Sequence, residues 1–251
     1  ADVSMALVAG FVLSGAKVSA IALLIASWSV MAVLGLAWRA DWLRTVVQQL
    51  VGLGVGAVAA FVIFVWGSSS SGDLQILTWD YRASSVQGLD LSSAWWGTAL
   101  GTVLLTLAII PRAAGTIGLP RRSAGAALAV GLVVASVAPV WILSQGVNEL
   151  WFAVAAAAPL AVLSAMGLER LWAVTEVTGS SKRWPWIATA AGLVSVLLAA
   201  LLWPLGSSDA VTLRALGPLL PWIAACVVAG VVWLRGGRPL LLPVLATVLI
   251  V

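Results

Sequence analysis

Seven stretches of this chain contain no charged side chain and are long enough to cross a lipid bilayer as helices. An α-helix rises ~1.5 Å per residue, so ~20 apolar residues are needed to cross ~30 Å of hydrocarbon. We therefore predict an all-α integral membrane protein, a polytopic transmembrane helix bundle with about seven full spans, in which residues 1–251 form a single domain. The predicted spans lie within residues 18–38, 45–72, 91–111, 123–148, 150–168, 184–208 and 215–234.

The positive charges between these stretches are unevenly distributed. When successive loops are placed on alternate sides of the membrane, ten of the 13 Lys and Arg residues fall on one side. They are Arg39, Arg44, Arg112, Arg121, Arg122, Arg170, Lys182, Arg183, Arg235 and Arg238. Basic residues accumulate on the cytoplasmic side of membrane proteins, so we expect this side to be cytoplasmic.

This topology makes the loops at 39–45, 112–123, 169–183 and 235–238 cytoplasmic and leaves 67–94 as an extracytoplasmic loop. It also accounts for the net charge of +4 without a nucleic-acid partner. The chain has 11 Arg against two Lys and is rich in Ala, Gly, Val and Trp, a bias typical of GC-rich coding. We therefore expect a multi-pass protein of a bacterial plasma membrane.

Two further apolar stretches lie at the ends of the chain. Residues 3–16 and 239–251 number 14 and 13, or ~20 Å as helices, which is too short to span the bilayer. We expect partial or re-entrant segments, and the first could be a complete re-entrant helix that turns at Gly15. A free carboxylate after Val251 would be costly inside hydrocarbon, and no Met precedes Ala1. These features indicate a segment of a larger membrane protein, or a processed chain.

The extracytoplasmic loop at 67–94 is the longest stretch outside the predicted spans. It mixes apolar residues with acids in a way that suits a short interfacial helix lying on the membrane surface. A ligand-binding role is the alternative. Trp79 and Tyr81 could stack on a sugar ring, while Asp80 and Arg82 could bind its hydroxyls or a phosphate.

Lys17 lies between two apolar stretches, near the outer membrane boundary of the predicted topology. A lysine at mid-bilayer costs at least ~3 kcal/mol, so its ammonium must extend to the interface or bind an anion. A lipid phosphate is the natural anion at that depth. Arg82 and Arg214 are the other cations predicted on that side, and both are candidates for binding a lipid phosphate. The simpler alternative is a lysine that only marks the interface.

The sequence around Lys17 resembles a known family. The run from Ala9 to Leu24, AGFVLSGAKVSAIALL, resembles the short-helix, lysine, long-helix unit of the GT-C superfamily of polytopic membrane glycosyltransferases. A second patch, Asn148-Glu149-Leu150-Trp151-Phe152 followed by small residues and Pro159, resembles the outward polar turn and helix found late in such proteins. The two patches cover about a fifth of the chain.

The resemblance implies sugar transfer from a polyprenyl-phosphate donor on the extracytoplasmic face, as part of cell-envelope glycan synthesis. A basic residue in the lysine unit of the family contacts the donor phosphate, which implies this role for Lys17. Asn148, Glu149 and Trp151 are then candidate contacts to the donor or acceptor. The family's catalytic base lies in an outward loop ahead of the lysine unit, so we expect it outside this segment, and Asp2 is not assigned to it.

Five acids share the predicted outward face, namely Asp73, Asp80, Asp90, Glu149 and Asp209. They could bind sugar hydroxyls or, as in the family, a divalent cation. The chain contains no His, which closes the common imidazole routes to metal binding and acid–base catalysis. The expected partners are membrane lipids, a polyprenyl-phosphate-linked sugar, a glycan or lipid acceptor, and other membrane subunits.

Two other classes of membrane protein remain as alternatives. A transporter or lipid flippase also needs a multi-helix bundle, but it usually places ionisable groups near the bilayer midplane. None of the seven predicted spans carries an ionisable group at its centre, which disfavours this class. A non-catalytic membrane subunit that supports a partner is the third possibility.

Overall fold

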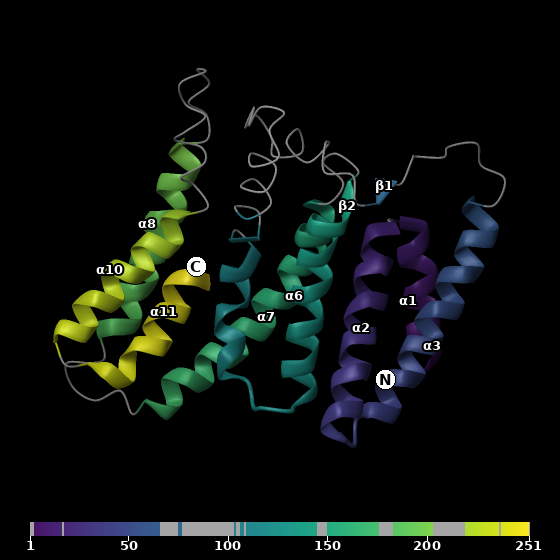
Figure 1. Cartoon of the computed structure of the whole chain (residues 1–251), viewed down its shortest axis with the longest axis horizontal. Helices are drawn as coiled ribbons and strands as arrows, with labels where there is room; N and C mark the ends of the chain where they lie inside the picture. Colours follow the sequence, from purple (N-terminus) through teal and green to yellow (C-terminus); the bar gives the residue numbers. More distant parts are fainter. Residues whose placement is uncertain are drawn as a thin grey trace. The chain divides into compact units, whose positions relative to one another are not determined.

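The computed structural model describes most of the chain as helix, with one pair of very short strands (Figure 1). Three of its helical stretches are long and apolar enough to cross a membrane, namely Ala20–Trp38, Leu43–Ile63 and Ala155–Val174. Shorter apolar stretches cover Ala124–Pro139, Trp184–Leu198, Leu220–Leu234 and Arg238–Ile250. The described residues are 3–16, 18–65, 75–76, 103, 106–107, 109–144, 150–175, 183–202, 219–235 and 237–250. These helices indicate an integral membrane protein of the all-α class.

The chain divides into two compact units. Unit 1 comprises Ala1–Leu77 and Pro120–Ala158, and unit 2 comprises Thr78–Leu119 and Pro159–Val251. The last of the three boundaries, between Ala158 and Pro159, falls inside helix α7 (Leu150–Val174). Each unit is formed by segments that are distant in the sequence, and the single domain expected from the sequence stays a prediction.

Unit 1 is built on four helices, α1 (Val3–Ala16), α2 (Val18–Trp38), α3 (Leu43–Ala60) and α6 (Ala124–Ile142). The π-helical turn η1 (Phe61–Val65) extends α3. Strand β1 (Gln75–Ile76) pairs antiparallel with β2 (Leu143–Ser144), with Gln75 opposite Ser144. Of the loop at 67–94, only β1 is described, so the interfacial helix stays a prediction.

Helix α3 is apolar on both its inner and its outer face. Val46, Leu53 and Ala60 are buried against the unit. Many of the side chains that face outward are also apolar: Val47, Val51, Val55 and Val58 are 43% to 64% exposed. Apolar side chains on the outward face of a helix of this length suit contact with lipid.

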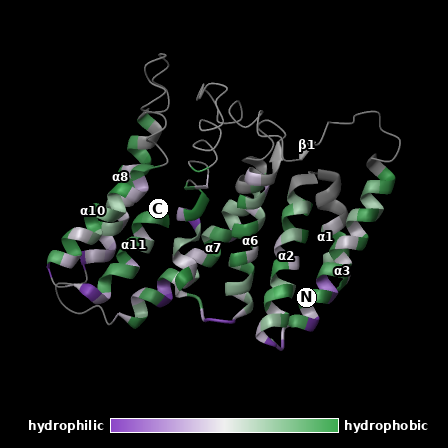
Figure 2. Ribbon diagram, in the orientation of Figure 1, coloured by the Kyte–Doolittle hydropathy of each residue, from purple (hydrophilic) through white to green (hydrophobic). Residues whose placement is uncertain are grey.

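Hydropathy follows the same pattern along the other helices. Figure 2 shows hydrophobic residues along the lengths of the described helices and most of the hydrophilic ones near helix ends. Cys226 is exposed on the outer face of α10 (Leu220–Leu234). Its neighbour Val227 is also exposed, so this face suits contact with lipid.

Glycines bring the helix backbones of unit 1 into direct contact. A Cβ added to Gly10 of α1 would lie 2.7 Å from the carbonyl oxygen of Leu53, and one added to Gly52 of α3 would lie 2.9 Å from that of Val3. A Cβ added to Gly131 of α6 would lie even closer to the carbonyl oxygen of Ser27 in α2. Gly10 and Gly52 therefore permit close packing of α1 against α3.

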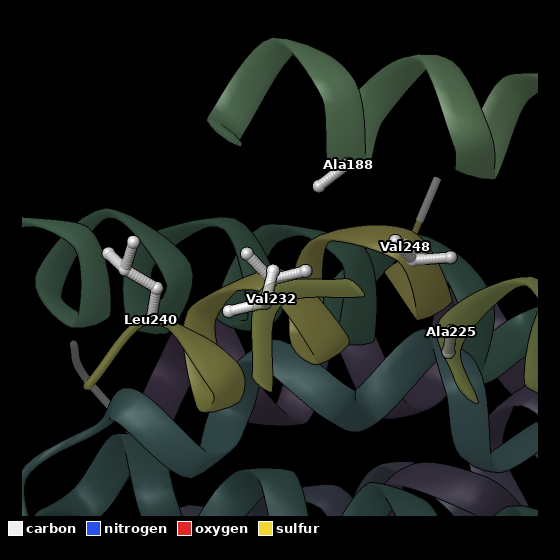
Figure 3. Packing of buried hydrophobic residues seen from close by; sticks show 6 residues of the cluster. Ala188, Ala225, Val232, Leu240 and Val248 are labelled. Carbon is white, nitrogen blue, oxygen red and sulfur yellow. The ribbon is translucent and has the colours of Figure 1, made fainter. Parts of the chain in front are cut away.

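Unit 2 is built from helices α8 (Trp184–Leu202), α10 and α11 (Leu241–Ile250), the C-terminal part of α7, and two 3₁₀ helices, η3 (Ile110–Gly118) and η8 (Arg238–Leu240). Its core is formed by Ala188, Ala225, Val232, Leu240, Val244 and Val248. Figure 3 shows Ala188 pointing from α8 toward the elements that carry Val232 and Val248. The C-terminal apolar stretch, expected to be a partial segment, is thus a short core helix.

The contact between η3 and α7 depends on the threefold period of the 3₁₀ helix. Residues three apart are aligned in this geometry, so Arg112, Gly115 and Gly118 lie on one stripe. Gly115 contacts the Ser164 backbone, and Gly118 contacts the Gly167 backbone. The Ser164 hydroxyl also donates a hydrogen bond of 2.6 Å to the carbonyl oxygen of Arg112. Small residues on both elements therefore permit backbone contact along this line.

Several predicted boundaries were wrong by a few residues. η3 continues to Gly118 and α7 continues to Val174, so the expected loops at 112–123 and 169–183 are shorter. Helix α1 passes through Gly15 and ends at Ala16, so the chain does not turn at that glycine. In each case charge or glycine content suggested an end, whereas helix continuation satisfies backbone hydrogen bonds that lipid cannot satisfy.

Substitution of Gly115 by Ala tests the backbone contact in unit 2. The added methyl group would meet the Ser164 backbone, which cannot move without displacing α7, so we expect Gly115→Ala to destabilise the protein by about 1–3 kcal/mol. Gly230→Ala in α10 is the matched control, because a Cβ there has no neighbour within 4 Å. Thermal unfolding in detergent, followed by circular dichroism, should separate the two variants. Equal unfolding temperatures would contradict the contact.

Candidate functional site

The residues predicted to bind substrate fall mainly outside the described part of the chain. The residues outside the described part are Lys17, Trp79, Asp80, Tyr81, Arg82, Asn148, Glu149 and Arg214, and also Asp73, Asp90 and Asp209. Trp151 lies in the first turn of α7. Their roles therefore stay predictions, and the described residues define the framework around them.

The helix ends that flank position 17 are described. α1 ends at Ala16 and α2 begins at Val18. The 21 residues of α2 then extend ~31 Å before the helix ends at Trp38. In unit 1, the ends of α1 and α2 beside position 17 therefore lie a full helix length from the turn that follows Trp38.

Arginines gather at this second end of unit 1. The turn after α2 carries Arg39, and the turn before α6 carries Arg121 and Arg122. The indole N–H of Trp42 donates a hydrogen bond of 3.3 Å to the carbonyl oxygen of Arg122 and so joins the two turns. The sequence predicted that these arginines lie on the same side of the membrane, and in unit 1 they do lie at the same end of the helices.

The turn after α2 is a Schellman motif with an unusual residue. The Ala40 N–H donates to the Gly35 carbonyl at 2.9 Å, and the Arg39 N–H donates to the Leu36 carbonyl at 3.2 Å. Arg39 therefore takes the position usually held by glycine, with φ of 53°. Arg122 also has a positive φ, 64°, in the turn closed by Ser123 and Pro120. A non-glycine residue in this conformation costs about 1–2 kcal/mol.

Unit 2 also carries arginines where its helices end. The Arg235 guanidinium lies 6.0 Å from the ring centre of Trp184 at the start of α8. The Arg238 guanidinium lies 4.8 Å from the ring centre of Trp233, near the end of α10. Such cation–π contacts hold a charged group beside an apolar surface. Trp184 and Trp233 therefore fit the interfacial position expected for tryptophan at helix ends.

Other tryptophans have a role that the sequence did not reveal. Trp28 donates to the side-chain oxygen of Gln49 at 3.0 Å, Trp172 donates to the hydroxyl of Thr247 at 3.1 Å, and Trp222 donates to the carbonyl oxygen of Leu107 at 3.0 Å. Their indole N–H groups connect helices instead of pointing to water. Trp172 lies near the end of α7, where sequence alone suggests an interfacial position, but its N–H donates to a hydroxyl inside unit 2. Only the partner, which is distant in sequence, distinguishes the two roles.

We also looked for metal-binding clusters and for similarity to known proteins. Within the described ranges, no three His, Cys, Asp or Glu side chains are close enough to hold a metal ion together. The acids proposed to bind sugar or a cation lie beyond those ranges. No protein-family model, curated protein or solved structure matches the chain.

Substitution of Arg39 by Gly tests whether the Schellman turn carries a strained residue. Glycine adopts positive φ without a steric cost, so we expect Arg39→Gly to stabilise the protein by up to about 1 kcal/mol. Ala40→Gly is the matched control. Ala40 is not among the residues with positive φ, so glycine there should give no gain in stability. The midpoint of thermal unfolding in detergent measures both changes. A lower midpoint for Arg39→Gly would show that the arginine side chain itself stabilises the turn.

Proposed function

We propose that this chain is a membrane-embedded glycosyltransferase, or part of one, that takes a sugar from a polyprenyl-phosphate donor on the extracytoplasmic face. The observation that carries the proposal is the pair of helices α1 and α2. A short helix ends at Ala16 and a long helix begins at Val18, so Lys17 stands between them as in the short-helix, lysine, long-helix unit of GT-C enzymes.

The distribution of charge in unit 1 supports the same proposal. The junction beside Lys17 belongs to the end of α2 away from Arg39, Arg121 and Arg122. If those arginines occupy the cytoplasmic leaflet, the α1–α2 junction belongs to the outer leaflet, where polyprenyl-phosphate sugars are used by the family. A cation at that depth would help to neutralise the departing phosphate, because the attraction between opposite charges is stronger where the dielectric constant is low.

The proposed reaction also needs groups from elsewhere. An acceptor hydroxyl must lose its proton to a carboxylate, and the phosphate leaving the sugar must be neutralised by cations. Lys17, Arg82 and Arg214 are our candidates for the phosphate, and Asn148 and Glu149 for contacts to donor or acceptor. The catalytic base itself is not assigned to a residue of this chain.

The described helices give no support to a transporter. Ionisable groups near the midplane are the usual mark of that class. Helices α2, α6, α8, α10 and α11 contain no ionisable residue except the exposed thiol of Cys226, and α3 has its only charge, Arg44, in its first turn. Glu169 and Arg170 of α7 lie near its C-terminal end. We therefore prefer glycosyl transfer.

The seven-span topology is part of the proposal and can be tested by labelling single cysteines. In a variant with Cys226→Ser, we expect Ser70→Cys and Ser208→Cys to react with a membrane-impermeant maleimide in intact cells. Asp41→Cys and Ser181→Cys should react only after lysis, because they belong to the arginine-rich side. Labelling of Asp41→Cys in intact cells would reverse the proposed orientation.

Substitution of Lys17 tests the proposed donor site in the full-length membrane protein. Loss of a charged partner for phosphate costs about 1.5–3 kcal/mol, so Lys17→Ala should lower turnover of a radiolabelled polyprenyl-phosphate sugar by roughly 10-fold to 100-fold. Lys17→Arg should retain part of the activity, because it keeps the positive charge. Donor binding should weaken along with turnover.

Arg121→Ala is the control for Lys17→Ala, since it removes one positive charge from the opposite end of unit 1. We expect this variant to keep the activity of the unaltered protein. Unchanged donor binding in Lys17→Ala would contradict the proposed role of Lys17. Substrate uptake into proteoliposomes without sugar transfer would instead indicate a transporter.

A further inference from the structure

Unit 2 contains a pocket between η3, α7 and α11, with a volume of about 500 Å³. Most of the residues that line it are apolar: Ile117 and Gly118 from η3, Leu171 and Val174 from α7, and Pro239, Leu242 and Pro243 from the C-terminal segment. Arg170 and Thr175 supply its polar groups. The Thr175 hydroxyl already donates to the carbonyl oxygen of Trp172 at 2.8 Å. Arg170, the charged group of the pocket, is therefore the donor available to a ligand.

Arg170 has the position and accessibility needed to bind an anion. Its side chain is exposed, and no ion pair of its guanidinium is found within the described ranges. Its neighbour Glu169 does not line the pocket, because consecutive residues of a helix point ~100° apart. The guanidinium presents five N–H donors in a planar fork, which matches the oxygens of a phosphate.

The apolar walls near Arg170 are open to the surroundings. Ile117 is 61% exposed, Val174 is 76% exposed and Leu242 is 44% exposed. A free phosphate ion would gain nothing from these side chains. A lipid would place its phosphate on Arg170 and an acyl chain along the apolar walls, so both parts of the pocket would be used.

The pocket lies at the C-terminal end of α7, where Arg170 stands four residues before the helix ends at Val174. Basic pockets between transmembrane helices on the cytoplasmic side bind the headgroups of anionic lipids. Among the groups that line this pocket, the only formal charge is positive, so a zwitterionic lipid would bring an unmatched cation as well as a phosphate. Charge complementarity therefore favours a lipid with a net negative headgroup.

We propose that this pocket binds one anionic phospholipid, with the headgroup phosphate on Arg170 and an acyl chain against Ile117, Leu171 and Leu242. The pocket belongs to unit 2 and does not depend on the role proposed for Lys17 of unit 1, although its cytoplasmic position rests on the proposed topology. It would hold η3, α7 and α11 together from the membrane side, because the lipid contacts all three.

Native mass spectrometry of the full chain in detergent tests this site. Phosphatidylglycerol should bind to the delipidated protein more tightly than phosphatidylcholine. Arg170→Gln should weaken phosphatidylglycerol binding about tenfold, the usual effect of losing a charge-assisted contact, and leave phosphatidylcholine binding unchanged. Arg170→Lys should fall between them, since it keeps the charge but loses the planar fork.

Arg183→Gln is the matched control, because Arg183 is an exposed arginine that does not line the pocket. It should bind phosphatidylglycerol as the unaltered protein does. Equal losses in Arg183→Gln and Arg170→Gln would overturn the proposal, since they would indicate a general attraction between charges. So would unchanged binding in Arg170→Gln.

Two further experiments test where the lipid binds and whether the bound phosphate belongs to a lipid or to a free phosphate ester. A phosphatidylglycerol with a photoreactive acyl chain should crosslink to peptides that contain Ile117, Leu171 or Leu242, and exclusive crosslinking elsewhere would overturn the proposal. Glycerol phosphate added in excess should compete weakly. Displacement of the lipid by glycerol phosphate at equal concentration would show that the pocket takes a free phosphate ester and that the apolar walls contribute nothing.

Discussion

Direct contact between helix backbones is the interaction on which both units depend. Helices in lipid gain little from burying apolar side chains, because the acyl chains around them are equally apolar, and van der Waals packing has to hold them together. Glycine permits that packing by removing the side chain at the point of contact. Gly10 and Gly52 join α1 to α3, while Gly115 and Gly118 join η3 to α7. The buried hydroxyl of Ser164 adds a hydrogen bond at the same contact in unit 2.

The placement of charge gives each unit an arginine-rich end. In unit 1, a tryptophan hydrogen bond joins two arginine-bearing turns, and Arg39 and Arg122 adopt backbone conformations that glycine would adopt at lower cost. Arginine at such positions is consistent with a need for charge at the membrane surface that outweighs a small loss of stability. In unit 2, Arg235 and Arg238 lie against tryptophan rings, while Arg170 opens onto an apolar pocket. The arginines therefore share a position at the ends of helices but differ in the groups that they contact.

The candidate donor site could be predicted from sequence only as a set of residue types. Lys17 stands out because a lone cation between apolar stretches needs an anion or water, and the helix ends at Ala16 and Val18 agree with the predicted break at that point. Which carboxylates approach it depends on the loops, and loop positions are not determined by hydropathy or charge. The pocket beside Arg170 was missed for a similar reason: its walls come from three segments, and no local pattern links Ile117 to Leu242.

The sequence by itself determined that the chain is helical, that its helices are apolar on every side, and that its arginines collect between them, because these properties depend on the length and composition of local segments. It did not determine which helices touch. The tertiary structure alone decided that the C-terminal stretch forms a core helix, that η3 continues as a 3₁₀ helix to Gly118, and that Trp172 bonds to Thr247 and does not face water. Each of these depends on a partner distant in the chain, and a uniformly apolar sequence carries too little pattern to specify that partner.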